Sequence, residues 1–275
     1  MLNLDYNYPL YDKRTPDKPS HFRNILSVYI IAIPAYFKRL IQNRKKDKTE
    51  ILEFIESLNF FCFWNDYDYG LLKQHYHAPA AFIKFGYFNA SDYSKNEIPA
   101  REKLNVLINN SASVYGNCLT VLEKVFQIVK QDILNELIVP LSYGDQSVKG
   151  LVIAYGEKKF GKKFVPLLHF IEKKSYYKLI QKVRVAFFGA RRQKAAGNIF
   201  FLLKLGVKVF LRKDNSMLKL LKEKGFIIFN FEADFNTVQD LKPLTPQEIK
   251  KNQDLYHFFF NNEIESEWMK KLLHS

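Results

Sequence analysis

The residues best suited to chemistry lie in one short basic stretch of the chain. Arg191, Arg192, Gln193 and Lys194 come directly before the run Ala195–Gly197. Guanidinium groups bind phosphate oxygens in pairs, and the first turn of a helix presents backbone N–H groups that have no partner within the helix. If a helix begins at this run, the stretch is suited to an anionic group such as a diphosphate.

The sequence on either side predicts the elements that hold this basic stretch. Val183–Phe188 is a short apolar run with β-branched residues, which is typical of a strand buried on both faces. Ala195–Leu205 has a broad apolar face and stops before Gly206, as a helix does. Val207–Leu211 is apolar again, so the three segments predict a strand, a crossover helix and a parallel strand.

The same alternation extends in both directions along the chain, and it predicts a doubly wound α/β domain from about Glu102 to about Asp240. Pro166 indicates that part of the third strand is irregular. The expected strands are 104–108, 136–141, 163–171, 183–188, 207–211 and 226–231, and the expected helices are 117–131, 147–160, 175–182, 195–205 and 217–224.

Four loops of this domain follow strands, and ligands of such sheets bind at the carboxyl ends of the strands. None of the loops matches a glycine-rich dinucleotide motif or a P-loop, and single Asn and Ser residues are more often helix caps than ligands. The prediction depends on all four loops lying at one edge. Their polar residues are Asn109, Asn110, Ser111 and Ser113 after the first strand, Tyr143 and Asp145 after the second, Ser175 and Tyr176 after the third, and Arg191–Asn198 after the fourth.

The formal net charge of +14 is concentrated around these loops. Between Lys149 and Lys213 the sequence has seventeen Lys and Arg residues against only Glu157 and Glu172. Such a field attracts anionic ligands or an acidic surface, although for most of the lysines a solvated face is the alternative. The two cysteines, Cys62 and Cys118, form neither a disulfide framework nor a metal site, which favours a reducing compartment.

The amino-terminal region predicts a smaller β-α-β run. Strands are expected at Leu58–Trp64 and Ala80–Phe85, with a helix from Asn65-Asp66 to Tyr76 between them. Earlier, the apolar stretch that begins at Ile25 leads into a basic cluster, so it reads either as an interfacial membrane anchor or as a core helix with a solvated end. The basic cluster consists of Lys38, Arg39, Arg44, Lys45 and Lys46.

Read together, L-N-V-L-I-N-N-S-A-S-V-Y-G-N-C-L, I-V-P-L-S-Y-G-D, S-Y-Y-K-L-I and R-Q-K-A-A-G-N-I-F-F-L-L-K-L-G-V resemble the TDP-N-acetylfucosamine:lipid II N-acetylfucosaminyltransferase family. The resemblance implies a GT-B-like fold with a Rossmann-like donor domain, a TDP- or UDP-type sugar donor and a lipid-linked saccharide acceptor. It also implies no metal or other cofactor, and a peripheral location on the cytoplasmic face of a bacterial inner membrane. The donor-binding residues implied are Asn110, Ser111, Ser113, Tyr143, Tyr176, Arg191, Arg192, Gln193, Gly197 and Asn198.

The resemblance divides the chain into three parts and shows two departures from the family. We expect a partial amino-terminal Rossmann-like domain at 1–97, a donor-binding domain at 98–244 and a C-terminal helical segment at 245–275. In the first loop Ser113 stands where the family has an acid and Cys118 where it has a histidine, and the amino-terminal domain is shortened. The catalytic residues are therefore unassigned.

Three functions compete at this point. The first is a glycosyltransferase that moves an acetamido-deoxy sugar, similar to N-acetylfucosamine, to a lipid-linked acceptor in bacterial surface polysaccharide synthesis. The second is an inactive scaffold at the membrane surface that retains the donor domain. The third is a basic nucleic-acid-binding protein; because no binding motif accompanies the charge, no nucleic-acid partner is expected.

Overall fold

The chain divides after Phe85 into two compact units. The computed structural model describes residues 52–85, 103–130 and 132–260 and Lys270. Three predictions lie outside the described residues. They are the domain limit near residue 97, the basic cluster at 38–46, and the part of the predicted C-terminal segment that follows residue 260, except Lys270. No helix among the described residues is long and apolar enough to cross a membrane.

The first unit contains the β-α-β run that the sequence predicts. Strands β1 (Phe60–Phe63) and β2 (Ala81–Lys84) pair in parallel, and α2 (Asp66–His75) connects them. Asn65 caps α2, because its side-chain oxygen accepts a hydrogen bond from the backbone N–H of Tyr67 at 3.1 Å. The predicted helix start at Asn65-Asp66 is therefore confirmed.

The second unit is built on a six-stranded sheet in which every neighbouring pair is parallel. The strand order is β5-β4-β3-β6-β7-β8, so the chain winds outward first on one side of β3 and then on the other. This is the doubly wound order, and the predicted α/β fold class is confirmed. The strands are β3 (Leu104–Ile108), β4 (Leu134–Pro140), β5 (Phe164–Leu167), β6 (Val185–Phe188), β7 (Lys208–Leu211) and β8 (Phe229–Asn230).

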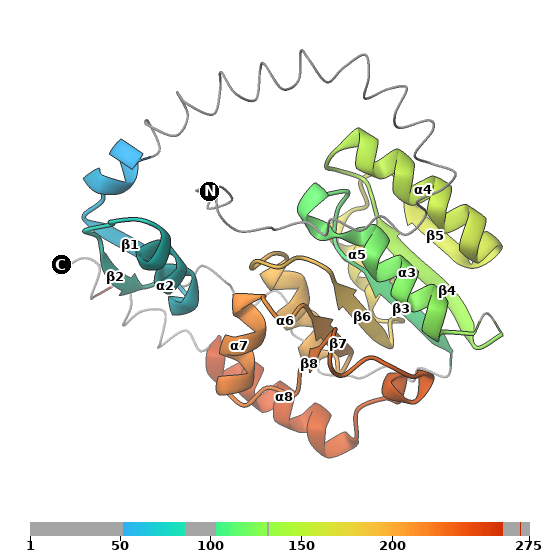
Figure 1. Cartoon of the computed structure of the whole chain (residues 1–275). Coiled ribbons are helices and arrows are strands. Elements are labelled where there is room, and N and C mark those ends of the chain that lie inside the picture. Colours follow the sequence, from blue (N-terminus) through green and yellow to red (C-terminus); the bar gives the residue numbers. More distant parts are fainter. Residues whose placement is uncertain (1–51, 86–102, 131, 261–269, 271–275) are drawn as a thin grey trace, which may run out of the picture. The chain divides into compact units, whose positions relative to one another are not determined.

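Helices cover both faces of this sheet. Right-handed crossovers on the two sides of β3 place their helices on opposite faces. Accordingly α3 and α4 pack together on one face, and α6 packs with α8 on the other (Figure 1). The helices are α3 (Cys118–Ile128), α4 (Gln146–Phe160), α5 (Lys173–Ile180), α6 (Ala196–Lys204), α7 (Ser216–Glu223) and α8 (Pro246–Phe259), with short 3-10 turns η3 (Val114–Gly116), η4 (Gly161–Lys163) and η5 (Val238–Leu241).

Several predicted boundaries are wrong, and the third strand differs most. The expected strand at 163–171 shortens to β5, and the residues between Leu167 and α5 form a loop. Pro166 does not interrupt β5; it pairs in register with Val139. A proline is tolerated there because β5 is an edge strand. Backbone groups on its outer side have no neighbouring strand to bond, so a missing N–H on that side breaks no ladder hydrogen bond. The strand expected at 226–231 shortens to β8, and the helix expected to reach residue 131 ends at Ile128.

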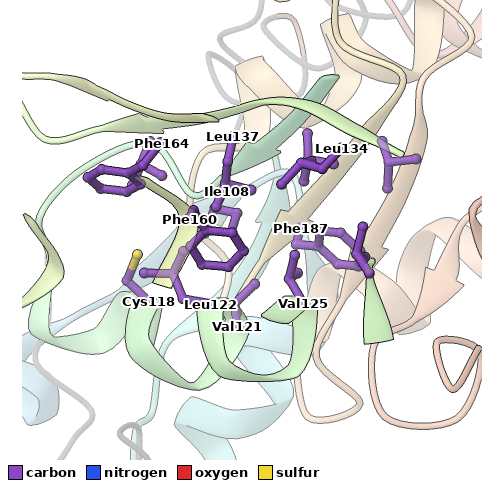
Figure 2. Packing of buried hydrophobic residues seen from close by; sticks show 14 of the residues in the cluster. Ile108, Cys118, Val121, Leu122, Val125, Leu134, Leu137, Phe160, Phe164 and Phe187 are labelled. Atoms are coloured by element: carbon purple, nitrogen blue, oxygen red, sulfur yellow. The ribbon is translucent and has the colours of Figure 1, made fainter. Parts of the chain in front are cut away.

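The main core lies between α3 and the sheet. Figure 2 shows Val121, Leu122 and Val125 of α3 on the side of the helix that faces strand residues such as Leu137. Phe187 of β6 is fully buried and stacks on Phe210 of β7, with ring centroids 4.9 Å apart. Burial of these apolar side chains fixes the strands whose carboxyl ends carry the predicted loops.

The C-terminal helix α8 belongs to the packing of this unit. Thr245 and Glu248 form a reciprocal capping box at its start. Gly206, which follows α6, has a φ of +72°, and a Cβ there would lie 2.8 Å from Ile249 of α8. The close approach of the two helices therefore needs glycine at this position. The boundary predicted at residue 244, between the donor-binding domain and the C-terminal segment, remains a prediction.

We expect Phe187→Ala to lower the free energy of unfolding by about 3–5 kcal/mol, because it leaves a cavity between three aromatic rings. Phe170→Ala is the control: Phe170 is 88% exposed, so its loss should change stability by less than about 0.5 kcal/mol. Urea denaturation of both variants measures the difference. Equal effects from the two substitutions would contradict this account of the core.

Candidate functional site

The reversal of winding between β3 and β6 creates the candidate site. The chain leaves β3 toward one face of the sheet and leaves β6 toward the other, so their outgoing loops diverge at the point where sheets of this topology form a ligand-binding crevice. The backbone N–H of Asn109, just after β3, donates to the carbonyl of Phe187 in β6 at 2.8 Å. The first and fourth predicted loops therefore start side by side.

Asn109 ties these two loops together inside the protein. Its side-chain oxygen accepts from the backbone N–H of Gly189 at 2.8 Å, and its amide nitrogen donates to the carbonyl of Gly116 at 2.9 Å. The residue is buried and has a φ of 57°, a left-handed conformation that Asn adopts more readily than most residues. We predicted that Asn109 offers side-chain hydrogen bonds to a ligand; instead, its buried amide bonds to the backbone of both loops.

Asn117 and Gly189 complete this connection, a role that the sequence did not predict. The Asn117 amide nitrogen donates to the carbonyl of Gly189 at 2.9 Å. A Cβ on Gly189 would lie 2.3 Å from the carbonyl oxygen of Gly116. Only glycine therefore permits the end of β6 to approach η3 this closely. The available signal was an asparagine at the predicted start of a helix, which indicates a cap but not a bond across the sheet.

The loop after β4 is bonded to the loop after β3 by backbone hydrogen bonds. Ala112 donates to the carbonyl of Tyr143 at 2.9 Å and accepts from the N–H of Asp145 at 2.8 Å. Gly144 has a φ of +120°, and a Cβ there would lie 2.4 Å from the Ala112 carbonyl oxygen. Asp145 then caps α4, because its side-chain oxygen accepts a hydrogen bond from the backbone N–H of Val148 at 3.0 Å. The second predicted loop is thus held against the first.

Tyr143 and Asn110 form the polar rim of the crevice on this side. The Asn110 amide nitrogen donates to the Tyr143 hydroxyl at 2.8 Å. Tyr143 is 59% exposed, so its ring presents a face for stacking while its hydroxyl is held. Ser111, beside Asn110, is buried. Of these three predicted donor residues, Asn110 and Tyr143 have the exposure that direct contact requires.

The basic loop after β6 is held by residues near the start of α7. The Asn215 amide nitrogen donates to the carbonyls of Ala190 and Arg192, each at 2.9 Å, while its oxygen caps α7 through Met217. Arg191 forms an ion pair with Asp214 at 2.8 Å. The charge of Arg191 is therefore balanced by a carboxylate, which leaves its neighbour as the more suitable anion ligand.

Arg192 and Lys194 point back toward the loop after β3. The Arg192 guanidinium lies over the ring of Tyr115, 5.0 Å from its centroid, which is a cation–π distance. The Lys194 ammonium donates to the hydroxyl of Ser113 at 2.5 Å. These contacts join the first and fourth loops across the crevice, and they place two cations beside the amino end of α6.

The first turn of α6 closes the site. Ala195 precedes the helix in a left-handed conformation with a φ of 57°. A Cβ on Gly197 would meet no described atom within 4 Å, so there is room above this turn. The amide nitrogen of Asn198 donates to the hydroxyl of Tyr176 at 3.3 Å. Burial raises the pKa of Tyr176 above its usual range, so its hydroxyl stays neutral.

The structure brings nearly all the predicted donor residues to one edge of the sheet. Gln193 is half-buried in the same loop as Arg192. Cys118, which stands where the family resemblance implies a histidine, is buried, and burial raises the pKa of its thiol to about 12. It therefore cannot exchange a proton near neutral pH. Among the described residues no group of His, Cys, Asp and Glu side chains is arranged to hold a metal ion.

Comparison with known protein families gives a match over most of the chain. Residues 63–275 match the family described as 4-alpha-L-fucosyltransferase glycosyl transferase group 56. A comparison with curated protein sequences gives no match.

Solved structures with the GT-B fold are also similar. Sucrose-phosphate synthase from Thermosynechococcus elongatus has a TM-score of 0.62 at 13% identity, over 85% of this chain and 61% of that one. A UDP-forming α,α-trehalose-phosphate synthase from Burkholderia vietnamiensis has a TM-score of 0.61 at 10% identity, over 82% of this chain and 63% of that one. This chain spans about three fifths of the length of these structures. At such low identity the similarity concerns the fold alone.

We expect Gly189→Ala to destabilise the second unit by about 1–3 kcal/mol, because the added methyl group collides with a backbone oxygen that cannot move alone. Gly150→Ala is the matched control. Gly150 lies within α4 with no described atom within 4 Å of its Cβ position, so alanine should raise stability by up to about 1 kcal/mol. Thermal or urea unfolding distinguishes the two. A Gly189→Ala protein as stable as the control would refute the close approach of the loops.

Proposed function

Because the chain belongs to the family of 4-alpha-L-fucosyltransferases of glycosyl transferase group 56, we propose that it is a glycosyltransferase. It transfers an acetamido-deoxy sugar, similar to N-acetylfucosamine, from a TDP- or UDP-type donor to a lipid-linked acceptor in bacterial surface polysaccharide synthesis. The observation that supports this proposal best is the meeting of the β3 loop, the β6 loop and the first turn of α6 at one crevice.

The crevice has the electrostatics that donor cleavage requires. When the bond between the sugar and the diphosphate breaks, negative charge grows on the departing diphosphate. Arg192, Lys194 and the first backbone N–H groups of α6 lie where they stabilise that charge. This catalysis is electrostatic: it needs no covalent intermediate, and no metal or other cofactor enters the proposal.

The rim of the crevice offers contacts for the rest of the donor. The exposed ring of Tyr143 is placed to stack on the nucleotide base, and Asn110 holds its hydroxyl. On the other side, the Tyr176–Asn198 pair offers neutral hydrogen-bonding groups to the sugar. In this proposal Gln193 lies beside the same part of the donor.

The acceptor side of the proposal depends on the amino-terminal part of the chain. The basic cluster at 38–46 would bind an anionic membrane surface on the cytoplasmic side, where a lipid-linked acceptor is presented. This membrane contact, like the identity of the acceptor, is proposed from the sequence and the family resemblance.

We expect Arg192→Ala to weaken donor binding by about 10- to 150-fold, since a hydrogen bond to a charged group contributes about 1.5–3 kcal/mol. A thermal-shift screen of TDP-, UDP- and GDP-sugars identifies the donor, and calorimetry with that donor measures the loss. The fold should persist, because the contact of the half-buried Arg192 with Tyr115 is a cation–π pair, and such pairs contribute about 0.5–2 kcal/mol.

Gly197→Ala serves as a companion variant for the same measurement. Alanine has a better helix propensity than glycine and no described atom opposes its methyl group, so stability should not fall. The methyl group would nevertheless occupy the space above the first turn of α6, and donor affinity should drop. Unchanged nucleotide affinity in both variants would exclude this loop as the diphosphate site.

One observation favours the inactive scaffold as a second candidate. Cys118 is buried and does not titrate near neutral pH, and Ser113 is occupied by Lys194, so neither residue replaces the family's acid or histidine as a proton carrier. A turnover assay of the full chain, with the identified donor and lipid-linked acceptor in vesicles, decides between the two. We expect a glycosylated lipid, detected by mass spectrometry. Donor and vesicle binding without any product would establish the scaffold instead.

A further inference from the structure

A cavity lies at the amino edge of the six-stranded sheet, where the strands begin. Its volume is about 640 Å³, and it is lined by residues at the amino ends of β3, β4 and β6 and by η5. Figure 1 shows the sheet edge where β3 and β4 start, away from the loop that leads into α6. Its apolar lining, which we call the floor, consists of Leu104, Ile133, Leu134, Val238 and Leu241.

The charged lining of this cavity, which we call the rim, is strongly cationic. Lys103, Lys163, Arg184 and Lys242 line it, against the single carboxylate of Asp132. These four residues come from four different parts of the chain, so the fold gathers the charges. Like charges repel one another, so placing four cations around one cavity favours an anion that compensates them.

Arg184 provides the most specific observation. Its guanidinium Nε is buried, and among the described residues no hydrogen-bond acceptor reaches it. The backbone of Arg184 is fixed on both sides, because its N–H donates to Asn105 at 2.9 Å and its carbonyl accepts from Lys208 at 3.2 Å. A buried donor without a partner is costly, so this group calls for an acceptor that the described residues do not supply.

The wall beside Arg184 is rigid and polar. The Asn135 amide nitrogen donates to the side-chain oxygen of Asn105 at 2.6 Å, and the Asn105 amide donates to the carbonyl of Lys182 at 3.2 Å. Asn135 lines the cavity and keeps its own side-chain oxygen and a second N–H for further bonds. The cavity thus combines amide and guanidinium donors, lysines and an apolar floor.

We propose that this cavity binds a phosphate group, at a site separate from the donor crevice. A phosphate matches the guanidinium fork and the surrounding lysines, and a compact apolar part attached to it fits the floor. Strand β3 has five residues and spans about 16 Å, which separates this site from the loops at the carboxyl edge. The ligand is therefore not the donor of the proposed reaction.

The phosphate can belong to a soluble compound or to a lipid headgroup, and two measurements distinguish these sources. Calorimetry with inorganic pyrophosphate probes the soluble form. This calorimetry is done on the full chain carrying Arg192→Ala, a substitution that should weaken anion binding in the donor crevice. Co-sedimentation with phosphatidylglycerol vesicles, compared with neutral phosphatidylcholine vesicles, probes the lipid form.

The variants are Arg184→Gln and the pair Lys103→Gln with Lys242→Gln. Both lysines are exposed, so the fold does not depend on their charge. The matched control is Lys158→Gln with Lys224→Gln, which removes the same charge from exposed positions outside the cavity. We expect each cavity variant to weaken binding at least about tenfold, and the control less than about twofold.

The two probes and the control pair distinguish a soluble phosphate ligand, a lipid phosphate and general charge attraction. Loss of pyrophosphate binding in the cavity variants assigns a soluble phosphate compound, and loss of vesicle binding in the same variants assigns a lipid phosphate. An equal loss in the cavity pair and the control pair would reduce the effect to general charge attraction and overturn the proposal. Absence of binding to both probes would overturn it as well. Either result leaves the proposed donor site unaffected, because donor binding is compared between the unchanged chain and its Arg192→Ala and Gly197→Ala variants, in which the cavity residues are not altered.

Discussion

The candidate site depends on how closely the end of β6 approaches the turn that follows β3. Asn109 bonds to the backbone of Gly116 and Gly189, and Asn117 bonds to Gly189 from the other side. Each of these buried backbone groups would otherwise lose its hydrogen bond to water without a replacement. With no side chain, Gly189 lets the two loops come within bonding distance. The basic loop is positioned because this junction is rigid.

In the folded protein, several basic residues are paired with carboxylates or buried against aromatic rings. Arg191 is paired with Asp214, and Arg212 is paired with Glu232. Lys204 lies buried over the ring of Tyr256, and burial lowers its pKa. These cations contribute to packing, so the large basic excess does not act as one field. Among the described residues, two groups of cations are placed for ligands, one around Arg192 at the carboxyl edge and one around Arg184 at the amino edge.

The two edges of the sheet also differ in construction. At the carboxyl edge, loops and a helix amino end present backbone N–H groups together with an exposed tyrosine, which suits an extended donor with a base, a diphosphate and a sugar. At the amino edge, an apolar floor with a cationic rim suits a smaller phosphate compound or a headgroup. One sheet can serve both because its strands keep the two sets of residues apart.

The sequence by itself determined the element types, their order and the chemistry of the loops, because period, caps and turn residues act over a few positions. It predicted the strands around Arg192 and the start of α2 closely, and it misjudged β5, where Pro166 lies in a regular edge strand. Only the tertiary structure decided which loops meet. Asn109 and Gly189 are eighty residues apart, and no local pattern reports a bond over that separation. The pairing of Arg191 and the gathering of cations around Arg184 were undetermined for the same reason: both depend on strand order.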